Sequence, residues 1–136
     1  MLFRSELIDY EWFCTISQDA AEAAKDSTIS VVQLKDMLEA RDRGEDDFVL
    51  IDVREPNEYE IVSIPGAVLI PKGQFLDGSA LADLPTDKRV VLHCKVGGRS
   101  AEALAVVKGA GFADAVHVGG GVLAWVNQIE PDKPTY

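Results

Sequence analysis

Short apolar runs alternate along this chain with segments whose apolar residues recur every three or four positions. The nearly continuous runs at 48–51 and 90–92 are typical of strands buried on both faces of a parallel sheet. We expect strands at 28–29, 48–51, 89–93 and 115–118, and a turn followed by a strand within 64–71.

Helices are expected between these strands. Ser30, with Gln33 three positions later, forms a capping-box pattern, and Gly44 ends the helix that Ser30 starts. The other helical segments are expected as a turn or short helix at 55–58, a short piece at 79–84, and helices at 100–109 and 122–129. Strands alternating with helices predict an α/β fold with a parallel sheet, in which ligands bind at the carboxyl ends of the strands.

The composition is that of a globular domain and not of a fibrous, disordered or disulfide-stapled chain. Of 136 residues, 47% are hydrophobic and 26% charged, so the chain can bury a core. A bilayer span needs about 20 apolar residues in a row, which the chain lacks. Residues 1–6 have neither the basic start nor the apolar run of a secretory signal. We therefore expect a cytoplasmic protein without membrane association.

The formal net charge of −10 is unevenly distributed. Residues 1–68 hold 16 acidic and 6 basic residues, whereas residues 69–136 hold 7 of each. The global charge argues against nucleic acid as a partner, since proteins that bind it present a basic surface. In the neutral half, Lys95 and Arg99 flank a cysteine, which favours a small anion as ligand.

One domain is expected at 28–136, preceded by a leader or linker at 1–27 without clear strand or helix periodicity. The two cysteines, Cys14 and Cys94, are too few for a disulfide framework, and no CxxC pair suggests a zinc site or redox cycling. We expect neither a metal nor an organic cofactor.

The segment that carries the chemistry follows the strand at 89–93 and reads Cys94-Lys95-Val96-Gly97-Gly98-Arg99-Ser100. Its two glycines permit backbone conformations closed to other residues, so the loop can curl with its amide N–H groups pointing inward. Such a nest, beside a helix capped near Ser100, forms an anion cradle that favours the Cys94 thiolate. The loop's lysine and arginine add positive charge. We predict that Cys94 is an ionised nucleophile that needs no histidine base. The alternative is a buried structural cysteine in a glycine-containing turn.

Asp52 ends a neighbouring strand at the same edge of the sheet. We expect it to pair with Arg54 and to orient the loop, while a turn or helix cap remains an open role for Asp52. His93 directly precedes Cys94, so its side chain should point to the opposite face of the strand. We interpret both His93 and His117 as structural.

These features together resemble the rhodanese family of single-domain sulfurtransferases over residues 28–136. The resemblance rests on Asp52-Val53-Arg54-Glu55, Ile64-Pro65-Gly66-Ala67, Cys94…Gly97-Gly98-Arg99-Ser100, and Gly119-Gly120-Gly121 followed by Trp125. The cysteine loop is specific, and the other segments are weak singly but fall in the family's order. The resemblance implies a central parallel sheet of about five strands with helices on both faces.

Residues 7–14, ending in Cys14, are similar to the segment that ends the adenylating domain of two-domain adenylyltransferase/sulfurtransferases. Those proteins activate ubiquitin-like sulfur carriers for molybdopterin or thiamine-type biosynthesis. The similarity implies that this chain is the C-terminal part of such a protein, with 1–27 as the tail of the adenylating domain. The nucleotide- and zinc-binding parts have no counterpart here, so adenylation is not predicted.

The resemblance also implies a reaction. Cys94 would take a sulfane sulfur and carry it as a persulfide, with Lys95, Arg99 and the loop amides stabilising the anions. The donor would be thiosulfate or a persulfidated cysteine desulfurase. The acceptor would be cyanide, a thiol, or the activated C-terminal glycine of a ubiquitin-like sulfur carrier that ends in a glycine pair.

Two other functions remain open. The first is a cysteine-dependent phosphatase of related fold, with arsenate reduction as a variant. The loop of such phosphatases is one residue longer, whereas Cys94 to Arg99 is six residues inclusive, which favours sulfur. The second is a non-catalytic docking module. Such a module could dispense with the cysteine or the loop glycines, and this chain keeps both.

Overall fold

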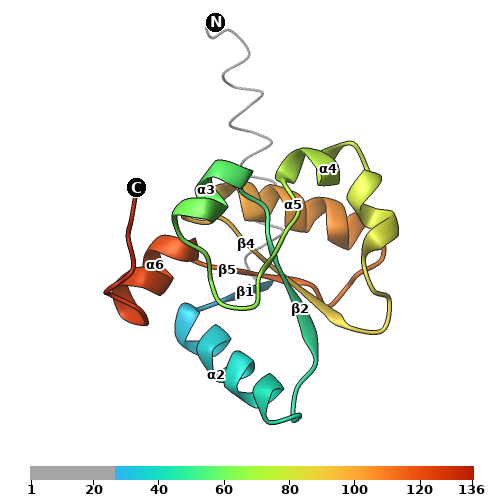
Figure 1. The fold of residues 1–136 in the computed structure, drawn as a ribbon. Helices are drawn as coiled ribbons and strands as arrows, with labels where there is room; N and C mark the ends of the chain where they lie inside the picture. The colour runs from blue at the N-terminus through green and yellow to red at the C-terminus, as the bar shows by residue number, and fades with distance from the viewer. Residues whose placement is uncertain (1–26) are drawn as a thin grey trace, which may run out of the picture.

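Five parallel strands build the sheet, in the order β1-β5-β4-β2-β3 (Figure 1). The strands are β1 (Thr28–Ile29), β2 (Phe48–Asp52), β3 (Val68–Leu69), β4 (Arg89–His93) and β5 (Val116–Val118). The computed structural model describes residues 27–136. The leader expected at 1–27 lies outside the described residues except for Ser27, and so does Cys14. The parallel α/β sheet expected from the sequence is confirmed.

The helices are α2 (Val31–Asp42), α3 (Pro56–Ile61), α4 (Lys72–Leu76), the 3₁₀ helix η2 (Ser79–Asp83), α5 (Gly98–Gly109) and α6 (Gly121–Gln128). The capping box of α2 is present, because Ser30 Oγ accepts from the Gln33 amide at 3.1 Å and Gln33 Oε1 accepts from the Ser30 amide at 2.8 Å. None of the helices within residues 27–136 has the length and apolar character needed to cross a membrane.

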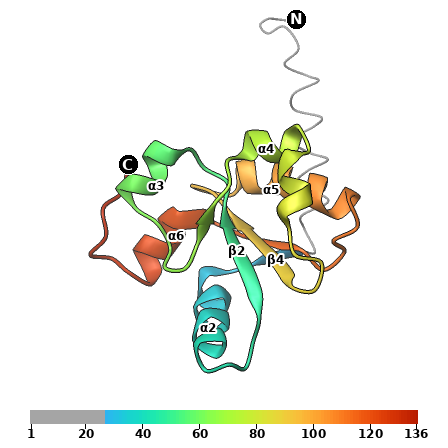
Figure 2. The same cartoon turned by 45° about the vertical axis from the view of Figure 1, so that its right-hand side comes forward.

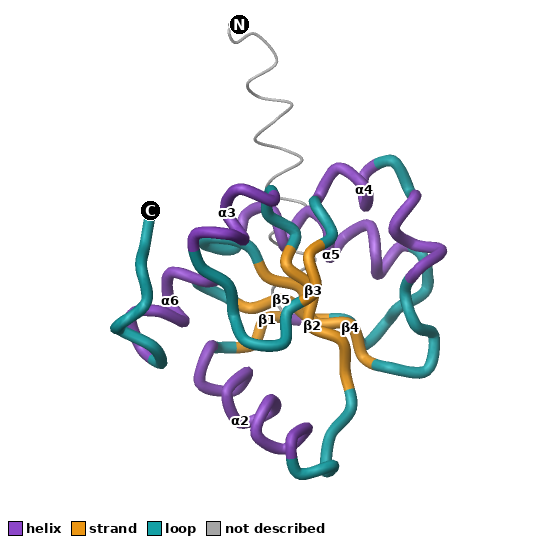
Figure 3. Tube along the Cα trace, in the orientation of Figure 1, coloured by secondary structure: helices purple, strands orange, loops and turns teal. Residues whose placement is uncertain are grey.

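The helices form two layers, one on each face of the sheet. Figure 2 and Figure 3 show α2 and α6 on one side, and α4 and α5 on the other. Alternate residues of β4 supply the two cores: Val90 and Leu92 pack with the α5 side, whereas Val91 packs with the α2 and α6 side. A strand buried in this way on both faces accounts for the continuous apolar run at 90–92.

Helix α5 begins two residues earlier than the sequence pattern predicts, which corrects the expected cap. Its N-cap is Gly97, with φ +125°, and Ser100 lies inside the first turn. Glycine readily adopts this positive φ, so the chain turns directly from the loop into the helix. The Ser100 hydroxyl donates to the Gly97 carbonyl at 3.1 Å and does not cap the helix.

Candidate active site

Cys94 stands at the carboxyl end of β4, the central strand of the sheet. Its side chain belongs to the core on the α5 side, and only 1% of the residue is exposed. The Gly97 amide donates to Cys94 Sγ at 3.0 Å, and the thiol donates to Ser100 Oγ at 3.6 Å. A backbone donor therefore already points at the sulfur, as in other nests that bind anions.

The N-terminus of α6 fixes the direction of the loop's peptide groups. The Val122 amide donates to the Cys94 carbonyl at 2.9 Å, and the Leu123 amide donates to the Lys95 carbonyl at 3.2 Å. In a trans peptide the N–H points opposite to the carbonyl of the same plane. The amides of Lys95 and Val96 consequently face away from α6, which is the direction that an inward-facing cradle requires.

This close approach depends on Gly121. The residue has φ +57°, and a Cβ there would collide with the carbonyl oxygens of Cys94 and Lys95. Backbone atoms cannot swing aside as a flexible side chain does. The glycine run that follows β5 therefore has a direct part in shaping the cysteine loop.

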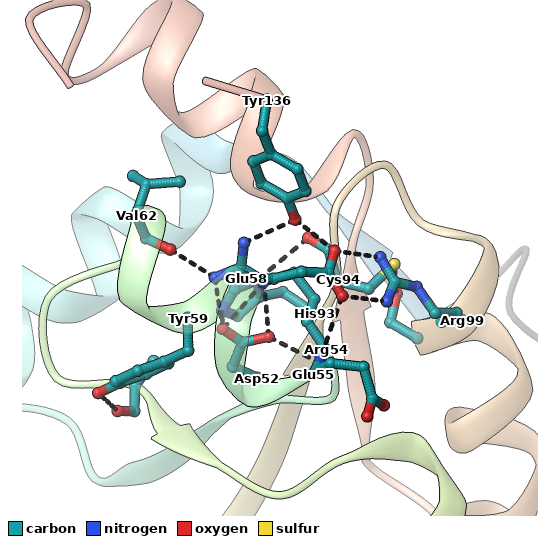
Figure 4. A network of polar contacts seen from close by, with 12 residues as sticks. Asp52, Arg54, Glu55, Glu58, Tyr59, Val62, His93, Cys94, Arg99 and Tyr136 are labelled. Atoms are coloured by element: carbon teal, nitrogen blue, oxygen red, sulfur yellow. Dashed lines mark hydrogen bonds and ion pairs between the residues drawn. The ribbon is translucent and has the colours of Figure 1, made fainter. Parts of the chain in front are cut away.

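Arg99 is held by a residue of α3. Its Nη1 and Nη2 atoms donate to Glu58 Oε1 and Oε2 at 2.6 and 2.9 Å (Figure 4). The Arg99 guanidinium lowers the pKa of Glu58 to about 2, and Glu58 in turn raises the pKa of Arg99. The ion pair is thus intact at neutral pH, and Glu58 balances the positive charge that the sequence places at the rim of the loop.

Tyr136 joins this network from the far end of the chain. Its hydroxyl donates to Glu58 Oε2 at 2.6 Å and accepts from Arg54 Nη1 at 2.8 Å (Figure 4). The Lys95 ammonium lies 4.3 Å from the centre of the Tyr136 ring, in a cation–π contact. Through Tyr136, the loop lysine, α3 and the strand end at Arg54 are tied together.

Asp52 and Arg54 form a fully buried ion pair at the end of β2, both being 0% exposed. Arg54 Nε and Nη2 donate to the two carboxylate oxygens at 2.9 and 2.7 Å, and the Arg54 amide adds a bond to Oδ1 at 3.0 Å. Nη2 also donates to the Val62 carbonyl at 2.6 Å, just after α3. The buried pair thus links the residue that follows α3 in sequence to the end of β2.

His93 lies on the other face of β4 from Cys94, beside Asp52. Its Nδ1 donates to the Cys94 carbonyl at 3.2 Å. Its Nε2 has no hydrogen-bond partner among the described residues and is 3.8 Å from Asp52 Oδ2. Burial lowers the pKa of His93, so the ring is neutral at physiological pH.

A second chain of polar side chains runs behind the sulfur on the α5 side of the sheet. Ser100 Oγ lies 2.8 Å from His117 Nδ1, and His117 Nε2 lies 3.1 Å from Thr28 Oγ1. In the sheet register His117 is opposite Leu92, so its side chain shares the face of Cys94. Burial lowers the pKa of His117.

The structure brings together Cys94 with its loop, and places Asp52 and Arg54 one strand away. Sequence reasoning missed Glu58 and Tyr136, and the sequence holds no signal for either because both act across long chain separations. His117, for which we expect a structural role, lies on the face of Cys94, as the alternation of side chains along β4 and β5 indicates. Within residues 27–136, no three His, Cys, Asp or Glu residues are grouped to hold a metal ion.

The fold is an α/β domain with a parallel sheet, a cysteine at the carboxyl end of its central strand, and a loop that donates an amide to the sulfur before a helix begins. The model of the rhodanese-like domain matches residues 30–128. The chain belongs to the rhodanese-like family.

Similar proteins extend this result. The probable adenylyltransferase/sulfurtransferase MoeZ of Mycobacterium tuberculosis is 53% identical over 133 residues, which is 97% of this chain and 33% of MoeZ. The adenylyltransferase and sulfurtransferase MOCS3 of Drosophila ananassae is 30% identical over 142 residues, 97% of this chain and 31% of MOCS3. The structure of the human single-domain sulfurtransferase TSTD1 matches with a TM-score of 0.65 at 26% identity, covering 75% of this chain and 96% of TSTD1. The chain spans about a third of the length of MoeZ and of MOCS3.

Proposed function

We propose that this protein is a sulfurtransferase that carries a sulfane sulfur on Cys94 as a persulfide. The observation that carries the proposal is the Gly97 amide, 3.0 Å from the Cys94 sulfur at the carboxyl end of the central strand. Membership of the rhodanese-like family supports it, as do two relatives and one matched structure whose names include sulfurtransferase.

The loop offers more donors than the sulfur of Cys94 uses. The Gly97 amide serves Sγ, while the amides of Lys95 and Val96 face away from α6. We assign these two amides to the outer sulfur of the persulfide. Backbone donors fixed in place stabilise a developing anion without reorganising, which is the basis of electrostatic catalysis. The Ser100 hydroxyl, 3.6 Å from Cys94 Sγ, is close enough to be a further hydrogen-bond donor to the persulfide.

In the first half-reaction the Cys94 thiolate attacks the outer sulfur of the donor. A bond forms between Sγ and that sulfur, and the donor's own sulfur–sulfur bond breaks. Thiosulfate leaves as sulfite with the bonding electron pair, and a protein persulfide leaves as a thiolate. The charges balance, because one thiolate is consumed for each persulfide anion formed.

In the second half-reaction an acceptor takes the outer sulfur and the Cys94 thiolate returns. Cyanide serves as the acceptor in the assay and becomes thiocyanate. In the cell we assign the donor role to a persulfidated cysteine desulfurase. The acceptor is the C-terminal glycine of a ubiquitin-like sulfur carrier for molybdopterin or thiamine-type cofactors, activated by an adenylating domain. The outer persulfide sulfur attacks the adenylated carbonyl carbon, AMP leaves, and an acyl disulfide with Cys94 forms. A cellular dithiol then reduces this disulfide, which releases the thiocarboxylate and the Cys94 thiolate and leaves the dithiol oxidised. The names of the relatives, which pair an adenylyltransferase with a sulfurtransferase, support this assignment, and the cytoplasm is the proposed compartment.

The test compares Cys14→Ser with Cys94→Ser, a matched pair because these are the two cysteines of the chain. Incubation with thiosulfate should add the mass of one sulfur atom to the Cys14→Ser protein and none to the Cys94→Ser protein. Thiocyanate should form from cyanide with the first protein alone. Equal activity of both proteins would refute the assignment of Cys94.

The same two proteins separate the competing functions. Hydrolysis of an aryl phosphate by Cys14→Ser, without thiocyanate formation, would support a phosphatase and overturn the proposal. Absence of both the sulfur adduct and thiocyanate, in a protein that is folded by circular dichroism, would support a docking module.

A further inference from the structure

The polar side chains behind Cys94 form a continuous path from the sulfur to a buried histidine. The thiol contacts Ser100 Oγ at 3.6 Å, Ser100 Oγ contacts His117 Nδ1 at 2.8 Å, and His117 Nε2 contacts Thr28 Oγ1 at 3.1 Å. The path crosses from the start of α5 to β5 and on to β1. The proposed sulfur transfer makes no use of it beyond Ser100.

We infer that His117 accepts the proton of the Cys94 thiol through the Ser100 hydroxyl, and so generates the nucleophile. This inference revises the expectation from the sequence that no histidine base is needed. His117 is a positioning residue in this scheme, because it acts on the sulfur through Ser100 without touching it. The inference concerns the nucleophile of the proposed sulfurtransferase, and it is tested below without any sulfur transfer.

The hydrogen-bond arrangement around Ser100 carries the argument. The hydroxyl has one proton and three polar neighbours: Gly97 O at 3.1 Å, His117 Nδ1 at 2.8 Å and Cys94 Sγ at 3.6 Å. The contact with His117 is the shortest. When Nε2–H donates to Thr28 Oγ1, Nδ1 presents its lone pair to the Ser100 hydroxyl. In this tautomer Nδ1 can take up a proton, once the Ser100 hydroxyl turns from the Gly97 carbonyl to donate to Nδ1.

The proton transfer balances without an outside reagent. The S–H bond of Cys94 breaks as its proton binds Ser100 Oγ, while the original Ser100 hydroxyl proton passes to His117 Nδ1. The products are a thiolate, an unchanged serine and an imidazolium. When an acceptor later removes the outer sulfur, the regenerated thiolate can recover the proton by the same path.

The surroundings keep His117 neutral before this step. Burial lowers the pKa of the ring, so its lone pair is available at neutral pH. The charged groups that flank Cys94 and Ser100 in the loop are engaged elsewhere: Arg99 on α5 is bound to Glu58, and Lys95 lies over Tyr136. His93, next to Cys94 on β4, is on the opposite face of the strand and is itself neutral.

The test measures the rate at which iodoacetamide alkylates Cys94 as a function of pH, in the Cys14→Ser protein. His117→Asn keeps an amide that can hydrogen-bond to Ser100 but cannot take up a proton. We expect the pH midpoint of alkylation to rise by about one unit in this variant, which corresponds to a rate about tenfold lower at neutral pH. Ser100→Ala should shift the profile in the same direction, and the double variant should shift it no further, because both changes break one path.

A pH profile of His117→Asn that superimposes on that of Cys14→Ser would overturn the inference, since a histidine that only packs or orients the loop leaves the midpoint unchanged. If His117→Asn does not fold, Ser100→Ala decides alone, because it removes one oxygen and leaves the ring in place. An unshifted midpoint in Ser100→Ala would then reject the path. Alkylation needs no donor or acceptor, so the result stands even if the sulfurtransferase assays fail.

Discussion

The cations beside Cys94 are both engaged by neighbouring side chains. Arg99 is bound to Glu58, and Lys95 rests on the ring of Tyr136. Tyr136 also bonds to Glu58, so the two cations share one support. In the proposed sulfur transfer, an anionic donor would meet backbone amides directed by α6 and would compete with Glu58 and Tyr136 for the two side-chain charges.

The Arg99–Glu58 pair gives the first prediction at the scale of single residues. The Arg99 guanidinium holds the pKa of Glu58 at about 2, whereas an ordinary glutamate titrates near 4.5. The carboxylate therefore stabilises the fold fully above about pH 4.5, and this contribution is lost as the pH falls toward 2. The free energy of unfolding of Glu58→Gln should lie below that of the wild type by about 1–2 kcal/mol at neutral pH. The gap should close in acid.

Urea unfolding at several pH values measures this gap. Glu60→Gln is the matched control, because Glu60 is exposed on the same helix. It should follow the wild type at each pH. A gap between Glu58→Gln and the wild type that stays constant into strong acid would show that the pair does not stabilise the fold through its charge.

The buried Asp52–Arg54 pair gives a second prediction. Asp52→Asn leaves the Arg54 charge buried without its counter-ion, which should lower the free energy of unfolding by about 3–5 kcal/mol. Asp47→Asn is the control, since Asp47 pairs with Lys88 on the surface and its loss should cost less than about 0.5 kcal/mol. Chemical denaturation of the two variants makes the comparison, and equal effects would contradict a structural role for the buried pair.

At the scale of elements, the cysteine loop is shaped as much by α6 as by its own glycines. The amides at the start of α6 hold the carbonyls of Cys94 and Lys95, and the missing side chain of Gly121 leaves room for this contact. A short segment thus acquires one conformation because a helix from a distant part of the chain supplies its hydrogen bonds. The conformation of the cysteine loop therefore depends on β4, α5 and α6 together.

Gly121→Ala tests this arrangement. The new Cβ collides with the loop carbonyls, and alanine must adopt φ +57°. We therefore expect the free energy of unfolding to fall by about 2 kcal/mol or more. We also expect the sulfur adduct on Cys94 to be lost. Gly109→Ala is the control within α5. A Cβ there has no neighbour within 4 Å, so thermal unfolding should show unchanged or slightly higher stability and mass spectrometry an intact adduct. Normal adduct formation in Gly121→Ala would refute the role of α6.

At the scale of the whole molecule, the sequence pattern predicts the sheet well because each strand is encoded locally. The apolar runs at 48–51 and 90–92 correspond to β2 and β4, and Ser30 with Gln33 marks the start of α2. Helix α4 escaped prediction, since five residues with one buried side chain, Phe75, make too short a pattern for helical periodicity.

The candidate site was predictable only in part. Cys94 and its loop are contiguous in sequence, so their chemistry can be inferred from neighbours alone. Glu58 is 41 residues from its partner Arg99 in the loop, and Tyr136 is 78 residues from Glu58. Only the folded chain brings these residues together. The sequence predicts Ser100 as the cap of α5, whereas the N-cap is Gly97, because its positive φ turns the chain into the helix earlier.

The 1% exposure of Cys94 has a kinetic consequence. A sulfur atom that solvent barely reaches reacts slowly with bulky or untargeted reagents. The same burial limits access of peroxide, which oxidises accessible thiolates. If Cys94 carries sulfur as proposed, its burial protects the unloaded thiol from oxidation until a donor binds.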